Sequence, residues 1–379
     1  MNRNLNTHQK PHFTFPKNGD FVNKHDGVEK DGELELSVTV KSSPGCTVTI
    51  GGTPAVESSG IYTANLCLRE GKNSITAKNL NEDTEAEITV FYSTKTVGKY
   101  RISSDDNILF LADITKHQDV YTSIFDNPYL AVYKKAHDLY GAKVHLNLFY
   151  AFDRASAECF TDERPDFDLS MMTDKFKAEW ESNSDWLTLS PHARQEFPDK
   201  PYKHAKPEEI TRDFSDIERE IVRFAGEKTL ASGVATVHWG EANVECVRAL
   251  RAMGYTALMG YFELDEAGEP LVSYYMDVPK VNYVGERDFF RDFDTDVTFG
   301  RIDRVTNIGS LSEIMDDMHA ITAHSHRGCF VSIMIHEQYF YPDYVNYLTD
   351  FEARVLEPAK HLFSLGYNGS FVSEVLNAI

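Results

Sequence analysis

The sequence has no long apolar run, few cysteines, and far fewer basic than acidic residues. No stretch approaches the roughly 18 consecutive apolar residues that a membrane span requires. The segment from Met1 to Asp20 contains no apolar core resembling that of a secretory signal peptide. Apolar residues make up 42% of the chain and no low-complexity tract interrupts it, as in an ordinary folded protein. The sequence therefore predicts a folded protein without a membrane partner.

The shortage of positive charge excludes a further class of partner. The chain has 38 Lys and Arg against 59 Asp and Glu, which gives a net charge of −21. The electric field of such a chain repels polyanions, so we expect it to bind neither nucleic acid nor an anionic membrane surface.

Cysteine is scarce, and its copies are odd in number and widely scattered: Cys46, Cys67, Cys159, Cys246 and Cys329. This pattern is typical of reduced thiols and predicts a cytoplasmic protein, with an exported protein that has lost its signal peptide as the alternative. Cys46 and Cys67 could lie on neighbouring strands, so one disulfide between them stays open.

The length of 379 residues predicts two domains, which we place at 1–97 and 98–379. Between about residues 32 and 92 the chain reads as short strands separated by turns, and Glu33 to Val40 alternates with a period of two. This pattern favours a small all-β sandwich. It resembles the immunoglobulin-like modules of bacterial carbohydrate enzymes, and the resemblance leaves open whether the domain is a spacer or binds carbohydrate.

Beyond Val97 the pattern changes to helices that alternate with strands. Asn127 and Pro128 begin a helix that Gly141 ends, because an N-cap with a following proline and a C-terminal glycine are typical helix boundaries. We expect further helices at about 213–229, 244–253 and 311–321, and strands at 143–150, 233–238 and 329–335. Such alternation predicts a parallel sheet, open or closed into a barrel, with its active site at the carboxyl ends of the strands.

Polar residues follow the predicted strands at four places: Asp105-Asp106, His192 with Glu196, His238-Trp239, and His336-Glu337. Two adjacent carboxylates repel one another unless a cation or a proton separates them. His192 and Glu196 are four residues apart and could face one way on a helical turn, as a nitrogen and an oxygen ligand. A histidine at a strand end, such as His336, suits proton transfer near neutral pH. Asp113 and His117 have the same i,i+4 spacing and are a competing pair.

The order and spacing of these four places resemble the polysaccharide deacetylase superfamily. Its members carry Thr-Phe-Asp-Asp, His-Ser-x-x-His, Arg-x-Pro-Tyr and Leu-x-His motifs, which Ser103 to Asp106, His192 to Glu196, His238 to Gly240 and Ile335-His336 match in part. The resemblance implies an α/β fold, an irregular (β/α) barrel that follows the β-sandwich. It also implies a divalent metal ion, with zinc as the first candidate.

The resemblance assigns roles residue by residue. Asp105 would be the general base and His336 the general acid, and the metal ligands would be Asp106, His192 and Glu196. The chain departs from the family pattern in two places: Glu196 stands where the family has a second histidine, and the arginine of the third motif is missing. Arg194 is the candidate to replace that arginine.

The implied function is hydrolysis of N- or O-acyl groups on a glycan by a metal-dependent deacetylase. Substrate contacts would come from Arg194, His238, Trp239, Glu337 and Tyr339, with Tyr341 as a further ring for stacking on a sugar. Two alternatives stay open. One is a catalytically silent carbohydrate-binding protein, and the other is a glycoside hydrolase that uses Asp105 and Glu337 as its carboxylate pair.

Overall fold

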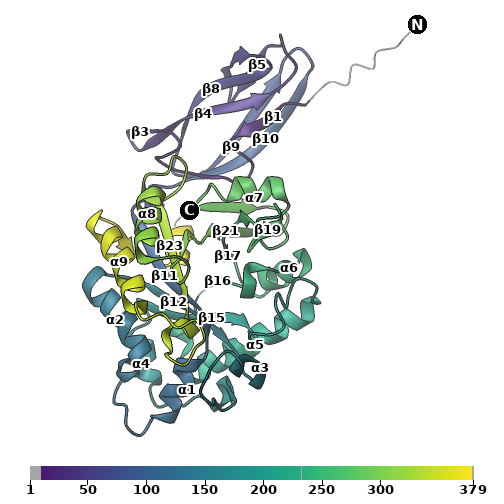
Figure 1. The fold of residues 1–379 in the computed structure, drawn as a ribbon. Helices are drawn as coiled ribbons and strands as arrows, with labels where there is room; N and C mark the ends of the chain where they lie inside the picture. Colours follow the sequence, from purple (N-terminus) through teal and green to yellow (C-terminus); the bar gives the residue numbers. More distant parts are fainter. Residues whose placement is uncertain (1–9, 232, 378–379) are drawn as a thin grey trace.

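The computed structural model describes residues 10–231 and 233–377, which form an all-β region and a larger mixed α/β region (Figure 1). All five cysteines are unpaired, so the alternative disulfide between Cys46 and Cys67 is not formed.

The all-β region consists of two five-stranded sheets that share one apolar core. The first sheet has the order β1-β4-β8-β7, with β3 beside β4, and the second has the order β2-β10-β9-β5-β6. In Glu33–Lys41 the alternation places Leu34, Leu36, Val38 and Val40 in the core. The strands are β1 (His12–Phe15), β2 (Phe21–Val22), β3 (Val28–Lys30), β4 (Glu33–Lys41), β5 (Val48–Ile50), β6 (Thr53–Pro54), β7 (Val56–Ser58), β8 (Ile61–Leu68), β9 (Gly71–Asn79) and β10 (Thr84–Tyr92).

The mixed region contains two larger sheets. One has the order β15-β12-β11-β23-β22, with β24 beside β11, and the other has the order β16-β17-β21-β20. All pairs are parallel except β20 with β21. The strands are β11 (Lys99–Asn107), β12 (Val144–Phe149), β15 (Leu187–Ala193), β16 (Val234–Ala235), β17 (Ala257–Gly260), β20 (Phe289–Asp292), β21 (Val297–Arg301), β22 (Arg304–Val305), β23 (Phe330–His336) and β24 (Asn368–Gly369). Two hairpins, β13 (Ala151–Phe152) with β14 (Phe167–Asp168) and β18 (Glu263–Leu264) with β19 (Pro270–Leu271), lie outside them.

The strands of the described ranges do not pair into one closed barrel. Main-chain hydrogen bonds nevertheless join the two sheets at two places. The Ala231 N–H donates to Leu189 O at 2.8 Å, and the Asp303 N–H, between β21 and β22, donates to Ser332 O at 2.8 Å. The fold is therefore mixed α/β, and its assignment to the deacetylase-type barrel stays a prediction.

Helices cover the outside of the sheets (Figure 1). They are α1 (Leu109–Lys116), α2 (Pro128–Tyr140), α3 (Arg154–Ala157), α4 (Lys177–Ser182), α5 (Pro207–Phe224), α6 (Val244–Ala252), α7 (Val278–Val284), α8 (Leu311–Thr322), α9 (Phe351–Ser364) and α10 (Val372–Leu376). The predicted boundaries of α2 are confirmed, since Asn127 accepts the Leu130 N–H and Gly141 has a left-handed φ of 63°. The helix predicted at 213–229 is wrong in its bounds because it begins at Pro207, a typical first helical residue.

The all-β region packs against the end of the sheets where the parallel strands begin. Phe21 and Phe91 share an apolar cluster with Val234, Ala257 and Phe330, which are the first residues of β16, β17 and β23. Buried Arg287 ties the two regions together, because its guanidinium lies 2.7 Å from carboxylate oxygens of both Asp20 and Asp26. The opposite end of the sheets, where the strands finish, is left for the site.

Candidate metal centre and active site

Asp105 and Asp106 lie at the carboxyl end of β11 and line the same cavity. Neighbouring residues of a regular strand point to opposite faces, so a regular β11 would separate them. The register of β11 against β12 shifts between Ser104 and Asn107, where three steps along β11 oppose two along β12. Asp106 is the residue with a left-handed φ of 62°. This bulge turns both carboxylates into the cavity, as bulges near active sites commonly do.

A second irregularity lies on the neighbouring strand. Residues Pro191 and Ala193 of β15 pair with consecutive residues of β12, so His192 is the extra residue. His192 belongs to the strand and Glu196 to the loop that follows. The helical turn expected for this pair is therefore wrong, because main-chain pairing with β12 holds this segment extended through Ala193.

Side-chain atoms of Asp106, His192 and His238, which follow or end three different strands, lie in contact with one another. Asp106 Oδ1 lies 3.2 Å from His192 Nε2 and 3.3 Å from His238 Nδ1. The two imidazole nitrogens are 3.1 Å apart. All three side chains are buried, and among the described residues they are the group of His, Cys, Asp or Glu that could hold a metal ion. His238, which follows β16 and was expected to contact substrate, thus joins Asp106 and His192 as a potential metal ligand.

The hydrogen bonds of the two histidines show which nitrogen of each ring can bind a metal ion. His192 Nδ1 lies 2.6 Å from Thr236 O, and His238 Nε2 lies 3.0 Å from Glu196 O. A carbonyl oxygen can only accept, so these nitrogens carry protons, and in the neutral form of each histidine the nitrogen facing Asp106 is a lone pair. Asp106 Oδ1 is itself buried without a hydrogen-bond partner. Three acceptors in contact need a cation or a proton between them, and histidines held by backbone carbonyls are typical metal ligands. These residues therefore fit a divalent metal such as zinc.

The charged groups of the site shift the pKa values of Asp106 and His192. Burial alone would raise the pKa of Asp106, but His336, His192 and His238 outweigh it and hold that pKa well below its ordinary value. Burial would lower the pKa of His192, but Asp105 and Asp106 outweigh burial and raise it. A proton and a metal ion consequently compete for the same lone pair on His192.

The remaining residues expected to take part in the chemistry lie around this group. Asn147 Nδ2 donates to Asp105 Oδ1 at 2.6 Å. His336 Nδ1 lies 2.8 Å from Asn307 Oδ1, and its Nε2 lies 3.9 Å from Asp106 Oδ2. The Glu196 side chain lines the cavity, outside the group of three converging atoms. Burial, followed by the charge of Asp106, raises the pKa of Glu196 to about 8, so its carboxyl is largely protonated at neutral pH.

Of the residues expected to contact substrate, Trp239 and Tyr339 line the cavity, and Trp239 is 39% exposed. Arg194 instead points to α5, where it lies 3.3 Å from Asp216, and its guanidinium stacks 4.4 Å from the Tyr150 ring. The residues that line the cavity do not include Arg194.

Glu337 is completely buried, and its side chain caps the N-terminus of α1. Its carboxylate accepts the main-chain N–H groups of Ile108, Leu109 and Phe110 at 2.6–2.9 Å, together with the Tyr341 hydroxyl at 2.7 Å. The segment 108–126 therefore contains a helix whose start Glu337 caps. The competing pair, Asp113 and His117, forms an ion pair of 2.9 Å on this helix, outside the group around Asp106.

Sequence reasoning did not find three amides of the site, those of Asn147, Asn307 and Gln338. Gln338 Nε2 donates to Asp106 Oδ2 at 2.9 Å and so holds the carboxylate from its other oxygen. A signal existed for Asn147, because His145 and Asn147 are polar residues two apart within an otherwise apolar strand. That period places both on one face of the sheet.

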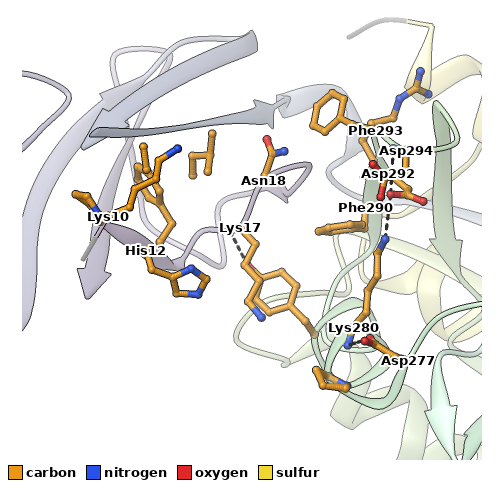
Figure 2. Close-up of a pocket in the computed structure, with 17 residues that line it drawn as sticks. Lys10, His12, Lys17, Asn18, Asp277, Lys280, Phe290, Asp292, Phe293 and Asp294 are labelled. Carbon is orange, nitrogen blue, oxygen red and sulfur yellow. Dashed lines mark hydrogen bonds and ion pairs between the residues drawn. The ribbon is translucent and has the colours of Figure 1, made fainter. Parts of the chain in front are cut away.

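The site lies in a cavity of about 390 Å³. A larger one, of about 600 Å³, lies between the all-β region, α7 and β20 (Figure 2). Its charged groups are of both signs and are engaged locally: Lys17 lies over the Tyr283 ring and Lys280 pairs with Asp292. It contains none of the residues around Asp106, and no residue of the all-β region lines the cavity of the metal centre.

The chain matches no family model and no curated protein. Among solved structures it is similar to a CE4 family pseudoenzyme from Bacillus anthracis, with 9% identity, 74% of this chain and 66% of that chain covered, and a TM-score of 0.35. It is also similar to a 4-alpha-glucanotransferase from Thermococcus litoralis, with 11% identity, 74% and 40% covered, and a TM-score of 0.43. The chain thus spans less than two thirds of either protein. Since neither TM-score reaches 0.5, the function proposed below depends on the geometry of this chain.

None of the helices in the described ranges is long and apolar enough to cross a lipid bilayer.

Proposed function

We propose that this chain is a metal-dependent hydrolase that removes N- or O-linked acyl groups from a carbohydrate, on an irregular barrel of the polysaccharide deacetylase type. The observation that carries the proposal is the contact of three atoms that can each offer a lone pair to a metal ion, Asp106 Oδ1, His192 Nε2 and His238 Nδ1. Three protein ligands leave a fourth position free, which is typical of catalytic rather than structural zinc sites.

The proposed chemistry divides between the groups around this position. A bound divalent ion would supply a Lewis acid and lower the pKa of a water molecule to near ~7. Asp105, held by the Asn147 amide, is placed to accept the proton of the attacking water. His336 is 26% exposed and oriented by Asn307, so it can donate a proton to the departing amine or alcohol. Trp239 and Tyr339 offer ring faces for a sugar.

A glycoside hydrolase that uses Asp105 and Glu337 is less compatible with these contacts. Both Glu337 oxygens already accept hydrogen bonds from α1 or from Tyr341. Neither is free to act on a glycosidic oxygen without exposing the start of that helix.

The metal centre can be tested by zinc content and zinc titration of the purified chain. We expect one zinc per chain, and we expect Asp106→Ala and His238→Ala each to weaken binding by more than the roughly 10–100-fold typical of outer-shell partners. His319→Ala, on the exposed side of α8, is the matched control and should bind zinc normally. Absence of stoichiometric zinc from the unmodified chain would overturn the proposal.

The third ligand can be distinguished by a further variant. The Glu196 carboxylate lies outside the group formed by Asp106, His192 and His238. Glu196→Gln should therefore retain zinc affinity within about tenfold of the unmodified chain. A loss as large as that of Asp106→Ala would instead make Glu196 the ligand that the family resemblance implies.

Release of carboxylate from acylated oligosaccharides then tests catalysis, and zinc binding without hydrolysis would favour the catalytically silent alternative.

A further inference from the structure

The cavity of the metal centre has two unlike ends. The polar side chains gather around Asp106, whereas the wall between β19, β22 and β23 is aliphatic. Ile302, Val305 and Met334 form the buried part of this wall, and Leu271 and Val272 are half-buried. Ile308 lies at the rim and is 55% exposed.

The loop that carries Val272 is held in a conformation that its sequence disfavours. Val272 has a φ of 49°, a left-handed backbone that β-branched residues rarely adopt. Its carbonyl accepts the N–H groups of Tyr261 and Phe262, at 3.0 and 3.3 Å. A Cβ on Gly240 would lie 2.4 Å from Val272 Cγ1, so glycine is required there for the loop to approach. Strain of this kind persists where the surroundings impose it, and it is common at ligand sites.

An aliphatic wall is a poor surface for a sugar ring. Hydroxyl groups buried against Ile302, Val305 and Met334 would lose their hydrogen bonds to water and gain none in return. An alkyl chain has no such requirement and gains from leaving water. The exposed ring of Trp239 is the better place for the sugar, at the polar end of the cavity.

We propose that the acyl group removed at this site is an alkyl chain longer than acetyl, seated along Ile302, Val305 and Met334. This inference rests on the proposed function. Hydrolysis forms a bond between the oxygen of water and the acyl carbon and breaks the bond from that carbon to the sugar nitrogen or oxygen. The proton of water passes to Asp105, and the leaving group takes a proton from His336. The products are a fatty acid and the free amine or alcohol.

A second, smaller space competes for the acyl group. A cavity of about 50 Å³ also reaches Asp106 and is lined by Ile108, Leu109 and Phe149, among others. It has room for a small acyl group such as acetyl. The two cavities thus make opposite predictions about chain length: acetyl substrates if the acyl group enters the small one, longer acyl substrates if it enters the large one.

The test is a series of N-acyl glucosamines, from acetyl through butanoyl and hexanoyl to octanoyl, hydrolysed by the zinc-loaded chain. Each methylene buried in an apolar pocket improves kcat/KM by about fourfold. We therefore expect a rise on the order of 100-fold from acetyl to hexanoyl. Equal or better turnover of the acetyl substrate would overturn the inference while leaving the proposed hydrolase intact.

Variants of the wall should change the ratio of octanoyl to acetyl turnover. Leu271→Asp places a charge beside the chain and should lower that ratio at least about tenfold. Val305→Thr, nearly the same shape with an added hydroxyl, is the gentler variant and should lower it by about threefold. Glu266→Ala, on the exposed part of the same loop, is the matched control and should leave the ratio unchanged. An unchanged ratio in both folded wall variants would contradict the proposal.

Calorimetric binding separates this inference from the proposed function. If no chain length is hydrolysed, the proposed function fails, and the pocket is then tested by comparing N-octanoyl- with N-acetylglucosamine as ligands. Octanoyl binding at least about tenfold tighter, weakened by Leu271→Asp, would support the alkyl pocket without catalysis. Equal binding of the two ligands would overturn it.

Discussion

The interiors of the two regions are built from different chemistry. In residues 28–92 of the all-β region, the buried side chains are apolar except for Ser42 and Asn79, which hydrogen-bond to one another at 3.1 Å. The sheets of the α/β region instead enclose buried charges and amides, among them Arg101, Asp105 and Asn147. Burying polar groups costs free energy, so an apolar interior serves stability and a polar one needs another reason to exist.

Five polar groups of the α/β interior form one directed chain of hydrogen bonds. Arg101 donates to His145 Nδ1 at 3.2 Å, and His145 Nε2 donates to Ser190 Oγ at 2.7 Å. Ser190 Oγ donates to Asn147 Oδ1, and Asn147 Nδ2 donates to Asp105 Oδ1, both at 2.6 Å. Burial, and then the charge of Arg101, lowers the pKa of His145, which keeps it neutral as this chain requires. Because the chain ends on the proposed base, we interpret the polar interior as support for catalysis.

The largest effect expected from this comparison is a loss of stability in the all-β region without a loss of function. Leu36→Ala removes a completely buried side chain between the two sheets and should lower the free energy of unfolding by about 2–5 kcal/mol. Chemical denaturation measures this loss. Zinc stoichiometry and kcat of the folded fraction should stay unchanged, because the site lies at the opposite end of the α/β region.

Val56→Ala, at an exposed residue of β7, is the control for Leu36→Ala and should change stability by less than about 0.5 kcal/mol. A fall in kcat of folded Leu36→Ala would show that the two interiors are coupled and would break the comparison.

In the α/β interior we expect the opposite result, a loss of kcat with a smaller loss of stability. Asn147→Leu removes the amide that holds Asp105 and should lower kcat by about 10–100-fold, the range typical of residues that orient reacting groups. The substitution removes the hydrogen-bond partner of Ser190 and of Asp105. The free energy of unfolding should therefore fall by about 1–3 kcal/mol at most. Steady-state kinetics with denaturation of the same preparations measures both quantities.

The exposed residue Asn65 on β8 supplies the matched control, since Asn65→Leu makes the same chemical change outside the α/β interior. Full kcat in Asn147→Leu would mean that the polar chain does not position the base.

The sequence predicted these two regions unequally well. Period-two alternation in Glu33–Lys41 and the capped helix after Asn127 depend on neighbouring residues, and the structure contains both. The four strand-end places were also visible, because chemistry at the ends of parallel strands follows from chain direction. The meeting of His238 with Asp106 and His192 was not visible, since it depends on bulges at Asp106 and His192 that shift the register between strands. Glu337 was expected to contact substrate, and its capping role was not visible for a similar reason: its contacts with residues 108–110 lie more than 200 residues away in sequence.

The pH dependence of stability should likewise arise in the α/β interior. Burial, followed by Asp106, raises the pKa of Glu196 from 4.5 to about 8 in the folded chain. A folded-state pKa above the unfolded one means that its stabilisation is complete below pH ~4.5 and is lost as pH rises towards 8. In the metal-free protein, Glu196 alone should therefore contribute a loss of up to about 1.4 kcal/mol of unfolding free energy per pH unit between pH 5 and 8.

Glu196→Gln should make the pH dependence of stability less steep, because glutamine cannot release a proton, while buried Glu337 and Asp288, whose pKa values are also raised, keep part of the slope. Zinc should flatten it too, since a cation beside the carboxyl lowers its pKa. Denaturation at pH 5, 6, 7 and 8, with and without zinc, measures the slope. An identical slope in Glu196→Gln would assign the pH dependence to other groups.

The smallest expected effect concerns the polar pair in the all-β interior. Ser42→Ala removes the acceptor of the Asn79 amide, whose carbonyl oxygen receives the N–H groups of Asn81 and Glu82. One unsatisfied buried donor should cost about 1 kcal/mol of unfolding free energy. Ser58→Ala, at an exposed position of β7, is the control and should have no measurable effect. Zinc affinity, kcat and the pH dependence of stability should all be those of the unmodified chain. Ser42 and Asn79 contact one another and a turn of the β-sandwich, and they contact no residue of the proposed active site. A functional change in Ser42→Ala would mean that buried polar groups of the two regions cannot be divided into structural and catalytic sets.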